Sequence, residues 1–122
     1  MSSNKYKAFT FINRIWSLRD GLSAFNSSSF SSIALFDVLE HLPADITALY
    51  EIHRILKPNG YLVATIPFLY RLHEFPFDYR RYTYPGIIHL LELTSFDPVI
   101  VKPIGTPSFV IRTLANEAML SS

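Results

Sequence analysis

The stretch from Phe30 to Pro67 constrains the fold more than any other part of the chain. It begins with a short apolar run, Ile33 to Phe36, which is typical of a strand buried on both faces of a sheet. Apolar residues then recur every three or four positions, and this spacing predicts an amphipathic helix; they are Ile46, Leu49, Ile52 and Leu56. A second strand is predicted from Tyr61 to Ile66.

The residues around the predicted helix mark its two ends. Asp45 is expected at the N-cap, where its carboxylate can accept the free backbone amides of the first turn. Lys57 suits the negative end of the helix dipole, and Pro58 cannot continue a helix. Asn59 and Gly60 tolerate positive φ and predict a turn before the second strand. Two buried strands joined by a helix predict a right-handed parallel βαβ unit.

The segments on either side of this unit predict further elements of an α/β fold. A short strand is expected at 15–18, within an otherwise irregular N-terminal part. Thr83 is the expected N-cap of a helix from Tyr84 to Leu93. The segment Asp97 to Val101 reads as a strand, and Thr106 to Leu120 as a helix. The predicted architecture is therefore a parallel βαβ core with flanking helices.

Length and composition limit the class of protein. A chain of 122 residues allows one domain, and 49% apolar against 17% charged residues excludes a disordered tail. The net charge of +1 gives no general attraction to nucleic acid or anionic membrane, and the absence of cysteine excludes disulfides and thiolate metal sites. No apolar run approaches the ~20 residues of a spanning helix, and no signal peptide is recognised. These features predict a cytoplasmic protein with no membrane or nucleic-acid partner.

Three segments together resemble one protein family. They are AFNSSSFSSIALFDVLEHL, ALYEIHRILKPNGYLVATIPF and HEFPFDYRRYT. They resemble the C-terminal half of the S-adenosylmethionine-dependent methyltransferases with a Rossmann-like fold, of the small-molecule type, over about Asp20 to Gly105. The resemblance implies a partial Rossmann-like fold, S-adenosylmethionine as cofactor, and a small-molecule or glycan-like methyl acceptor.

The chain departs from this family at several positions. Ser31 stands where the family has an aspartate, and Asn59 replaces one of two glycines in the turn. The family's glycine-rich cofactor loop and its ribose-binding acidic residue have no counterpart in 1–19, because the only glycines are at positions 21, 60, 86 and 105. Residues 1–122 are therefore interpreted as one methyltransferase-like domain that lacks parts of the family's fold at both ends. A complementing chain or a homo-oligomer is an expected partner.

The predicted cofactor contacts lie beside the strands. In open α/β sheets, ligands bind beyond the carboxyl ends of the strands. By the resemblance, Asp20 and Gly21 correspond to the contact with the adenine ring, and an ordinary turn is the alternative. Asp37 follows a strand end, where its carboxylate can meet the amino acid part of the cofactor. A solvated loop carboxylate is the alternative for Asp37.

The predicted catalytic and substrate residues lie in two segments. Glu40 and His41 follow the first strand, and His41 is a candidate general base because imidazole titrates near the working pH. His41 can instead bond backbone carbonyls and fix the turn. His73, Asp78 and Arg81 lie on the long connection after the second strand. His73 is the second catalytic candidate.

Glu40, Asp78 and Arg81 are the substrate-binding candidates. The planar fork of Arg81 can hold an anionic group, or it can pair with Asp78 three residues away and only order the loop. A metal set drawn from His41, His73, Glu74 and Asp78 is not compelled by any spacing, so no metal site is predicted. The open alternative to an enzyme is a non-catalytic methyltransferase remnant or binding module.

Overall fold

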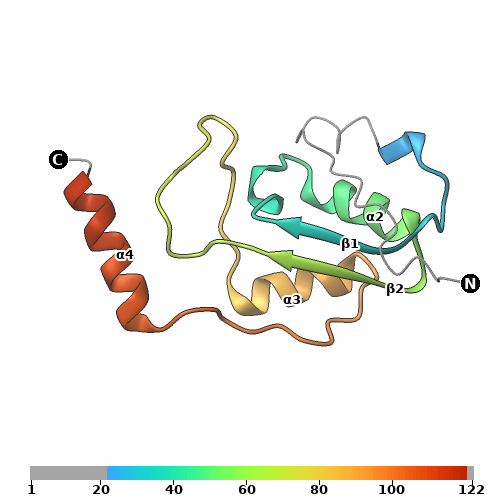
Figure 1. Cartoon of the computed structure of the whole chain (residues 1–122). Helices are drawn as coiled ribbons and strands as arrows, with labels where there is room; N and C mark the ends of the chain where they lie inside the picture. Colours follow the sequence, from blue (N-terminus) through green and yellow to red (C-terminus); the bar gives the residue numbers. More distant parts are fainter. Residues whose placement is uncertain (1–21, 121–122) are drawn as a thin grey trace, which may run out of the picture.

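The computed structural model describes residues 22–120 (Figure 1). The predicted strand at 15–18, and Asp20 and Gly21, lie outside the described residues. The elements follow in the order η1 (Leu22–Ala24), β1 (Phe30–Phe36), η2 (Leu39–His41), α2 (Asp45–Ile55), β2 (Leu56–Thr65), α3 (Tyr84–Leu93) and α4 (Pro107–Leu120).

The βαβ unit is confirmed. Strands β1 and β2 pair in parallel with α2 between them in the chain, and in the described residues they form a two-stranded sheet. Ile33 pairs with Leu62, and Phe36 pairs with Thr65. Both strands therefore end at one edge of the sheet, where the segments that follow them come close together.

The junction of α2 and β2 differs from the prediction. The helix ends at Ile55, so Lys57 and Pro58 already belong to β2. Leu56 pairs with Phe30 and is buried, which explains why the strand begins there. The register of pairing shifts after Leu56, and the predicted turn lies within the irregular stretch of β2 that causes the shift. Asn59 has a φ of 62°, the positive value expected for this turn. A Cβ on Gly60 would lie 2.8 Å from the carbonyl oxygen of Lys57, so a side chain there would clash.

The start of α2 also differs in detail. Ala44 occupies the N-cap, and Asp45 is the first helical residue, whose Oδ1 accepts a 2.9 Å bond from the Ile46 amide. Ile46 is not on the buried face, since its side chain is 42% exposed. The helix turns other apolar residues inward, and Leu49 and Ile52 are fully buried.

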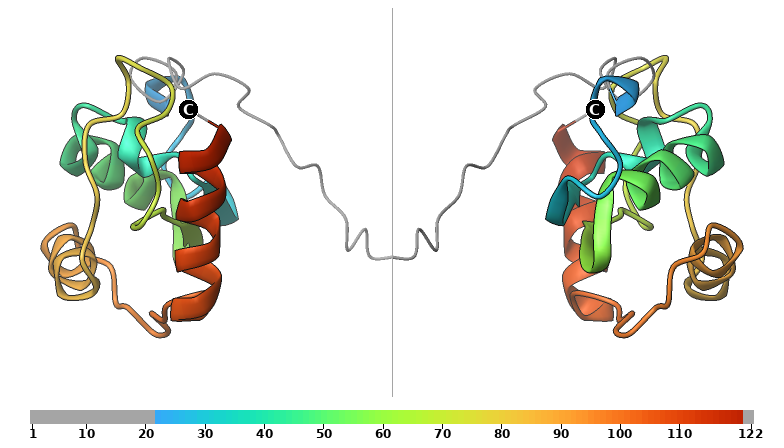
Figure 2. Two further views of the ribbon diagram at one scale, coloured as in Figure 1. Left: turned by 90° about the vertical axis from the view of Figure 1, so that its left-hand side faces the viewer. Right: turned by 90° about the vertical axis from the view of Figure 1, so that its right-hand side faces the viewer.

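The core lies on one side of the sheet. Figure 2 shows α2 and α3 on the same side of the strands, and both helices contribute buried residues, such as Leu49 and Leu90, to one cluster. The opposite face of the strands carries exposed aromatic and aliphatic side chains, and Phe36 is 65% exposed. The prediction that the first strand is buried on both faces is therefore wrong for the described residues.

After β2, one predicted helix is confirmed, the second begins one residue later than predicted, and the predicted strand is absent from the described residues. Helix α3 has the predicted bounds, and the Thr83 hydroxyl caps it by accepting a 3.1 Å bond from the Gly86 amide. Asp97 to Val101 is irregular chain and not a strand. Pro98 has no amide hydrogen to give to a ladder. Helix α4 begins at Pro107 and stands apart from the core in Figure 1.

No helix within residues 22–120 is long and apolar enough to cross a membrane.

Candidate functional site

The candidate site lies at the edge where both strands end. Asp37 follows β1 directly, and the loop 66–83 leaves the end of β2 (Figure 1). The Asp37 amide donates to the Thr65 carbonyl oxygen at 3.0 Å, and the Thr65 hydroxyl donates to Asp37 Oδ1 at 3.1 Å. Asp37 has a φ of 53°, a strained conformation for a residue other than glycine. The carboxylate is thus fixed against the end of the neighbouring strand.

The short helix η2 places two ionisable side chains in the interior. The His41 amide donates to the Val38 carbonyl oxygen at 2.9 Å, which closes the turn. Glu40 is 0% exposed, and His41 is also buried. Burial disfavours a charged carboxylate, so it raises the pKa of Glu40 above its usual value.

The loop 66–83 is tied to η2 through its backbone. The Tyr79 amide donates to the Glu40 carbonyl oxygen at 2.9 Å. Nδ1 of His41 lies 2.5 Å from the Phe77 carbonyl oxygen. A carbonyl can only accept, so Nδ1 carries the proton in this bond. His41 therefore fixes the loop, as the structural alternative predicted, and its Nε2 remains for another partner.

Arg80 and Tyr82 form a second anchor that the sequence analysis did not identify. Arg80 donates to the carbonyl oxygen of Leu42 at 2.6 Å and lies 3.2 Å from Asp45 Oδ2. The Tyr82 hydroxyl donates to the same Asp45 oxygen at 2.8 Å. Burial, and then the bond to Asp45, raise the pKa of Tyr82. Asp45 thus joins the loop to the start of α2.

Asp78 and Arg81 form the predicted local ion pair. Two nitrogens of Arg81 donate to the two carboxylate oxygens of Asp78, at 2.5 and 3.0 Å. Arg81 also donates to the Arg71 carbonyl oxygen at 3.0 Å, and Asp78 accepts from the His73 amide at 3.0 Å. The hydrogen bond from Arg81 holds the pKa of Asp78 well below its usual range. The pair therefore organises the loop, and a contact with substrate stays a prediction.

His73 completes a cluster with Glu40 and His41. Oε1 of Glu40 lies 3.3 Å from Nε2 of His41 and 3.6 Å from Nε2 of His73. The two imidazole rings meet edge to face, with their centroids 4.6 Å apart. Nδ1 of His73 lies 3.3 Å from Asp78 Oδ2 and 3.2 Å from the Arg71 carbonyl oxygen. Both imidazoles thus turn Nε2 toward Glu40 and Nδ1 toward acceptors in the loop.

The fold therefore brings five of the predicted site residues into one place. Glu40 and His41 come from η2, whereas the other three come from the loop: His73, Asp78 and Arg81. Asp37 lies at the same edge but bonds Thr65. No spacing in the sequence indicates that Glu40 and His73, 33 positions apart, converge. Parallel pairing of the strands is the only signal that places their two segments together.

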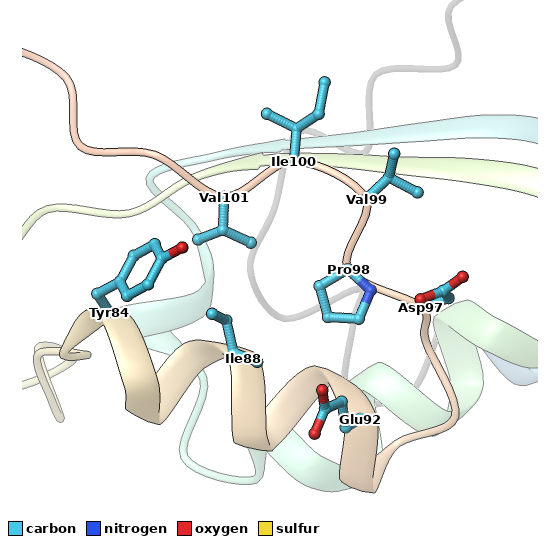
Figure 3. A pocket seen from close by; sticks show the side chains of 8 residues that line it. All are labelled: Tyr84, Ile88, Glu92, Asp97, Pro98, Val99, Ile100 and Val101. Atoms are coloured by element: carbon cyan, nitrogen blue, oxygen red, sulfur yellow. The ribbon is translucent and has the colours of Figure 1, made fainter.

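A hollow of about 370 Å³ lies apart from this cluster, between α3 and the segment 97–101 (Figure 3). Tyr84, Ile88 and Glu92 line it from the helix. On the opposite side, Pro98 and Val101 point toward the helix, whereas Val99 and Ile100 point away from it (Figure 3). None of the predicted site residues within 22–120 lines this hollow. Its lining includes the carboxylates of Glu92 and Asp97 but no histidine, whereas the edge of the sheet brings two histidines and a buried glutamate together and remains the candidate site.

Comparison with known proteins adds one finding. A family model described as a methyltransferase domain matches residues 11–64. The resemblance to methyltransferases is confirmed over that stretch. The matched residues include β1, η2, α2 and most of β2, and therefore Glu40 and His41, whereas the loop with His73 lies beyond them. No curated protein and no solved structure matches the chain.

Proposed function

We propose that this chain acts in methyl transfer from S-adenosylmethionine to a small-molecule or glycan-like acceptor. The domain match supports methyltransferase chemistry in general. The observation that carries the proposal is the polar cluster of Glu40, His41 and His73 beside the carboxyl ends of two parallel strands. Ligands bind at that edge in open α/β sheets.

The reaction that we propose is an in-line displacement. An acceptor oxygen forms a bond to the methyl carbon while the carbon–sulfur bond breaks, and its electron pair passes to the sulfonium sulfur. The products are S-adenosylhomocysteine and the methylated acceptor, and the acceptor's proton passes to a base. Holding the reacting atoms in line supplies much of the rate enhancement in such a step.

His73 is the better placed of the two candidate bases. Its side chain is 22% exposed, so an acceptor can reach it, whereas His41 is buried and bonded to the loop. Asp78 lies beside Nδ1 of His73 and can orient the ring, with Nε2 as the atom that receives the proton. Asp37, which precedes η2 in the chain, is the candidate contact for the amino acid part of the cofactor.

A non-catalytic binding module is the second candidate function. The observation in its favour is that residues 1–19 contain neither a glycine nor an acidic residue. Backbone that approaches the cofactor closely and a carboxylate that binds the ribose are the usual means of holding a nucleoside in this kind of fold. In this alternative the cluster binds an acceptor-like ligand without transferring a methyl group.

Methyl transfer from radiolabelled S-adenosylmethionine tests the proposal. The 122-residue chain is incubated with millimolar cofactor and a panel of small hydroxylated compounds and oligosaccharides. We expect label in an acceptor, and we expect His73→Gln to lower the rate by about 10²–10⁴-fold, the usual contribution of general acid–base catalysis. His53→Gln is the matched control, since His53 is exposed on α2. No transfer to any acceptor, with an acceptor still bound, would establish the binding module instead.

A further inference from the structure

The carboxylate of Glu40 is buried without a hydrogen bond. Its side chain is 0% exposed, and among residues 22–120 neither Oε1 nor Oε2 has a hydrogen-bond partner. A buried polar group normally has such a partner, because an unsatisfied one costs its full desolvation free energy. The terminal nitrogens of the nearby Arg81 guanidinium donate to Asp78, and its Nε has no hydrogen-bond partner in this part of the chain. Within the described residues, Glu40 therefore interacts electrostatically with Arg81 and the two imidazoles but accepts no hydrogen bond from them.

The two nearest groups to Glu40 are imidazole nitrogens with available lone pairs. His41 donates from Nδ1 to the Phe77 carbonyl oxygen, so its neutral form has an unprotonated Nε2, 3.3 Å from Glu40 Oε1. Nδ1 of His73 faces the Arg71 carbonyl oxygen and Asp78, which likewise leaves Nε2 free, 3.6 Å from the same oxygen. In this tautomer three electron-pair donors, Oε1 of Glu40 and the two Nε2 atoms, face one another.

We infer that Glu40, His41 and His73 form a binding site for a divalent zinc ion. One potential ligand atom from each of the three lies within 4.8 Å of the others. Two ligands of a tetrahedral zinc ion, each bonded at 2.0–2.1 Å, are about 3.3–3.4 Å apart. The 3.3 and 3.6 Å separations from Glu40 Oε1 to the two Nε2 atoms are close to this value.

The surroundings of the cluster match the needs of a metal site. Histidine ligands of metals characteristically donate their other N–H to a carbonyl or carboxylate, which fixes the tautomer. His41 has the Phe77 carbonyl for this purpose, and His73 has Asp78 and the Arg71 carbonyl. Imidazole ligands favour zinc over magnesium and calcium, which prefer oxygen. Two histidines and one glutamate leave a fourth position open, and His73, at 22% exposure, provides the route from solvent.

The zinc site does not depend on methyl transfer, and it excludes the general-base role in the zinc-bound chain, because zinc and the acceptor's proton would use the same lone pair on Nε2 of His73. The sequence predicts no metal site, and the potential ligands weighed from it were His41, His73, Glu74 and Asp78, whereas the fold brings Glu40 to the two histidines. A zinc ion would compensate the charge of Glu40 and accept the lone pairs of both imidazoles at once. A proton could bridge Glu40 and only one of the two imidazoles. The inference thus stands on the geometry of three side chains from two separate segments.

Zinc binding by the tag-free 122-residue chain tests the inference. The chain is treated with a chelator, dialysed and titrated with zinc chloride by calorimetry, and the bound metal is counted by mass spectrometry. We expect one zinc ion per chain. The chain has four histidines and no cysteine, so two matched controls exist: His53→Ala and His89→Ala, both on exposed helix positions.

The variants decide between this cluster and any other site. We expect His73→Ala to weaken zinc binding by at least about 100-fold, more than the loss of an outer-shell partner does. Glu40→Gln should weaken it similarly, and circular dichroism checks that each variant is folded. The visible spectrum of a cobalt-substituted chain should show four-coordinate cobalt and should lose that signature in His73→Ala. Absence of saturable binding, or equal weakening by His53→Ala or His89→Ala, would overturn the inference.

Discussion

Glu40→Gln should stabilise the metal-free chain at alkaline pH. Glu40 is fully buried, and its Oε1 faces the Nε2 atoms of both His41 and His73, which are unprotonated in the neutral tautomers. A glutamine amide has nearly the same shape and can donate hydrogen bonds to both nitrogens. Relieving an unsatisfied buried acceptor is worth about 1–3 kcal/mol in the free energy of unfolding. With a urea m-value of about 1–3 kcal/mol/M, the midpoint should rise by roughly 0.5–2 M.

The pH dependence of this effect gives the sharper test. Burial raises the pKa of Glu40 in the folded state, so between its unfolded and folded pKa values the folded chain binds the extra proton. The contribution of Glu40 to stability is therefore greatest at acidic pH and is lost as the pH rises through the folded pKa. The titratable and charged groups that face it, His41, His73, Asp37 and Arg81, remain in both chains. The advantage of Glu40→Gln should accordingly shrink as the pH falls toward 4.

Urea unfolding followed by circular dichroism, in the presence of a chelator at pH 8 and pH 4, measures both quantities. Glu51→Gln is the matched control. A hydrogen bond from Arg54 lowers the pKa of Glu51, so its contribution to stability is present at neutral pH and is lost on acidification. The control should therefore show no gain at pH 8. A loss of stability in Glu40→Gln at pH 8, or an equal gain at both pH values, would refute the reasoning.

Two further predictions concern the core and the loop. Leu49→Ala should lower the free energy of unfolding by about 2–5 kcal/mol, because Leu49 is fully buried. Ile46→Ala, on the exposed side of the same helix, should have a much smaller effect. Similar urea midpoints for the two variants would show that the buried face is misassigned. Asp78→Ala and Arg81→Ala should each destabilise the loop by about 1.5–3 kcal/mol, measured as faster proteolysis within 66–83. The double variant should be little less stable than either single variant. Fully additive effects would mean that the two side chains do not act as a pair.

The parts of the fold that the sequence predicted are those with a local signal. The spacing of Leu49 and Ile52 reports a helix face directly, and Thr83 followed by Pro85 marks a helix start in any context. The errors lie where tertiary packing decides. Ile46 fits the same periodicity as Leu49 but is not on the buried face of the helix. Leu56 was predicted as a helix residue, although its pairing with Phe30 makes it a strand residue.

The candidate site was predictable in its location but not in its contacts. Parallel strands that end at one edge place Glu40 and His73 near each other, and this follows from the βαβ pattern alone. The orientation of the side chains depends on backbone bonds of the loop, such as those of Tyr79 and Phe77 to η2. No sequence pattern encodes these bonds. Arg80 was missed for the same reason, since its partners are backbone carbonyls.

Binding of S-adenosylmethionine to the chain tests the proposed function most directly. A site without the ribose carboxylate lacks two charge-assisted hydrogen bonds, at about 1.5–3 kcal/mol each, and should bind about 10²–10⁴-fold more weakly than one that has it. If a complete site binds the cofactor at about 1 μM, equilibrium dialysis with labelled cofactor should give saturable binding in the ~0.1–10 mM range. Binding should weaken further in Asp37→Asn and stay unchanged in the control Glu92→Gln, which lies on α3. Binding that does not saturate, or that ignores Asp37→Asn, would contradict the account.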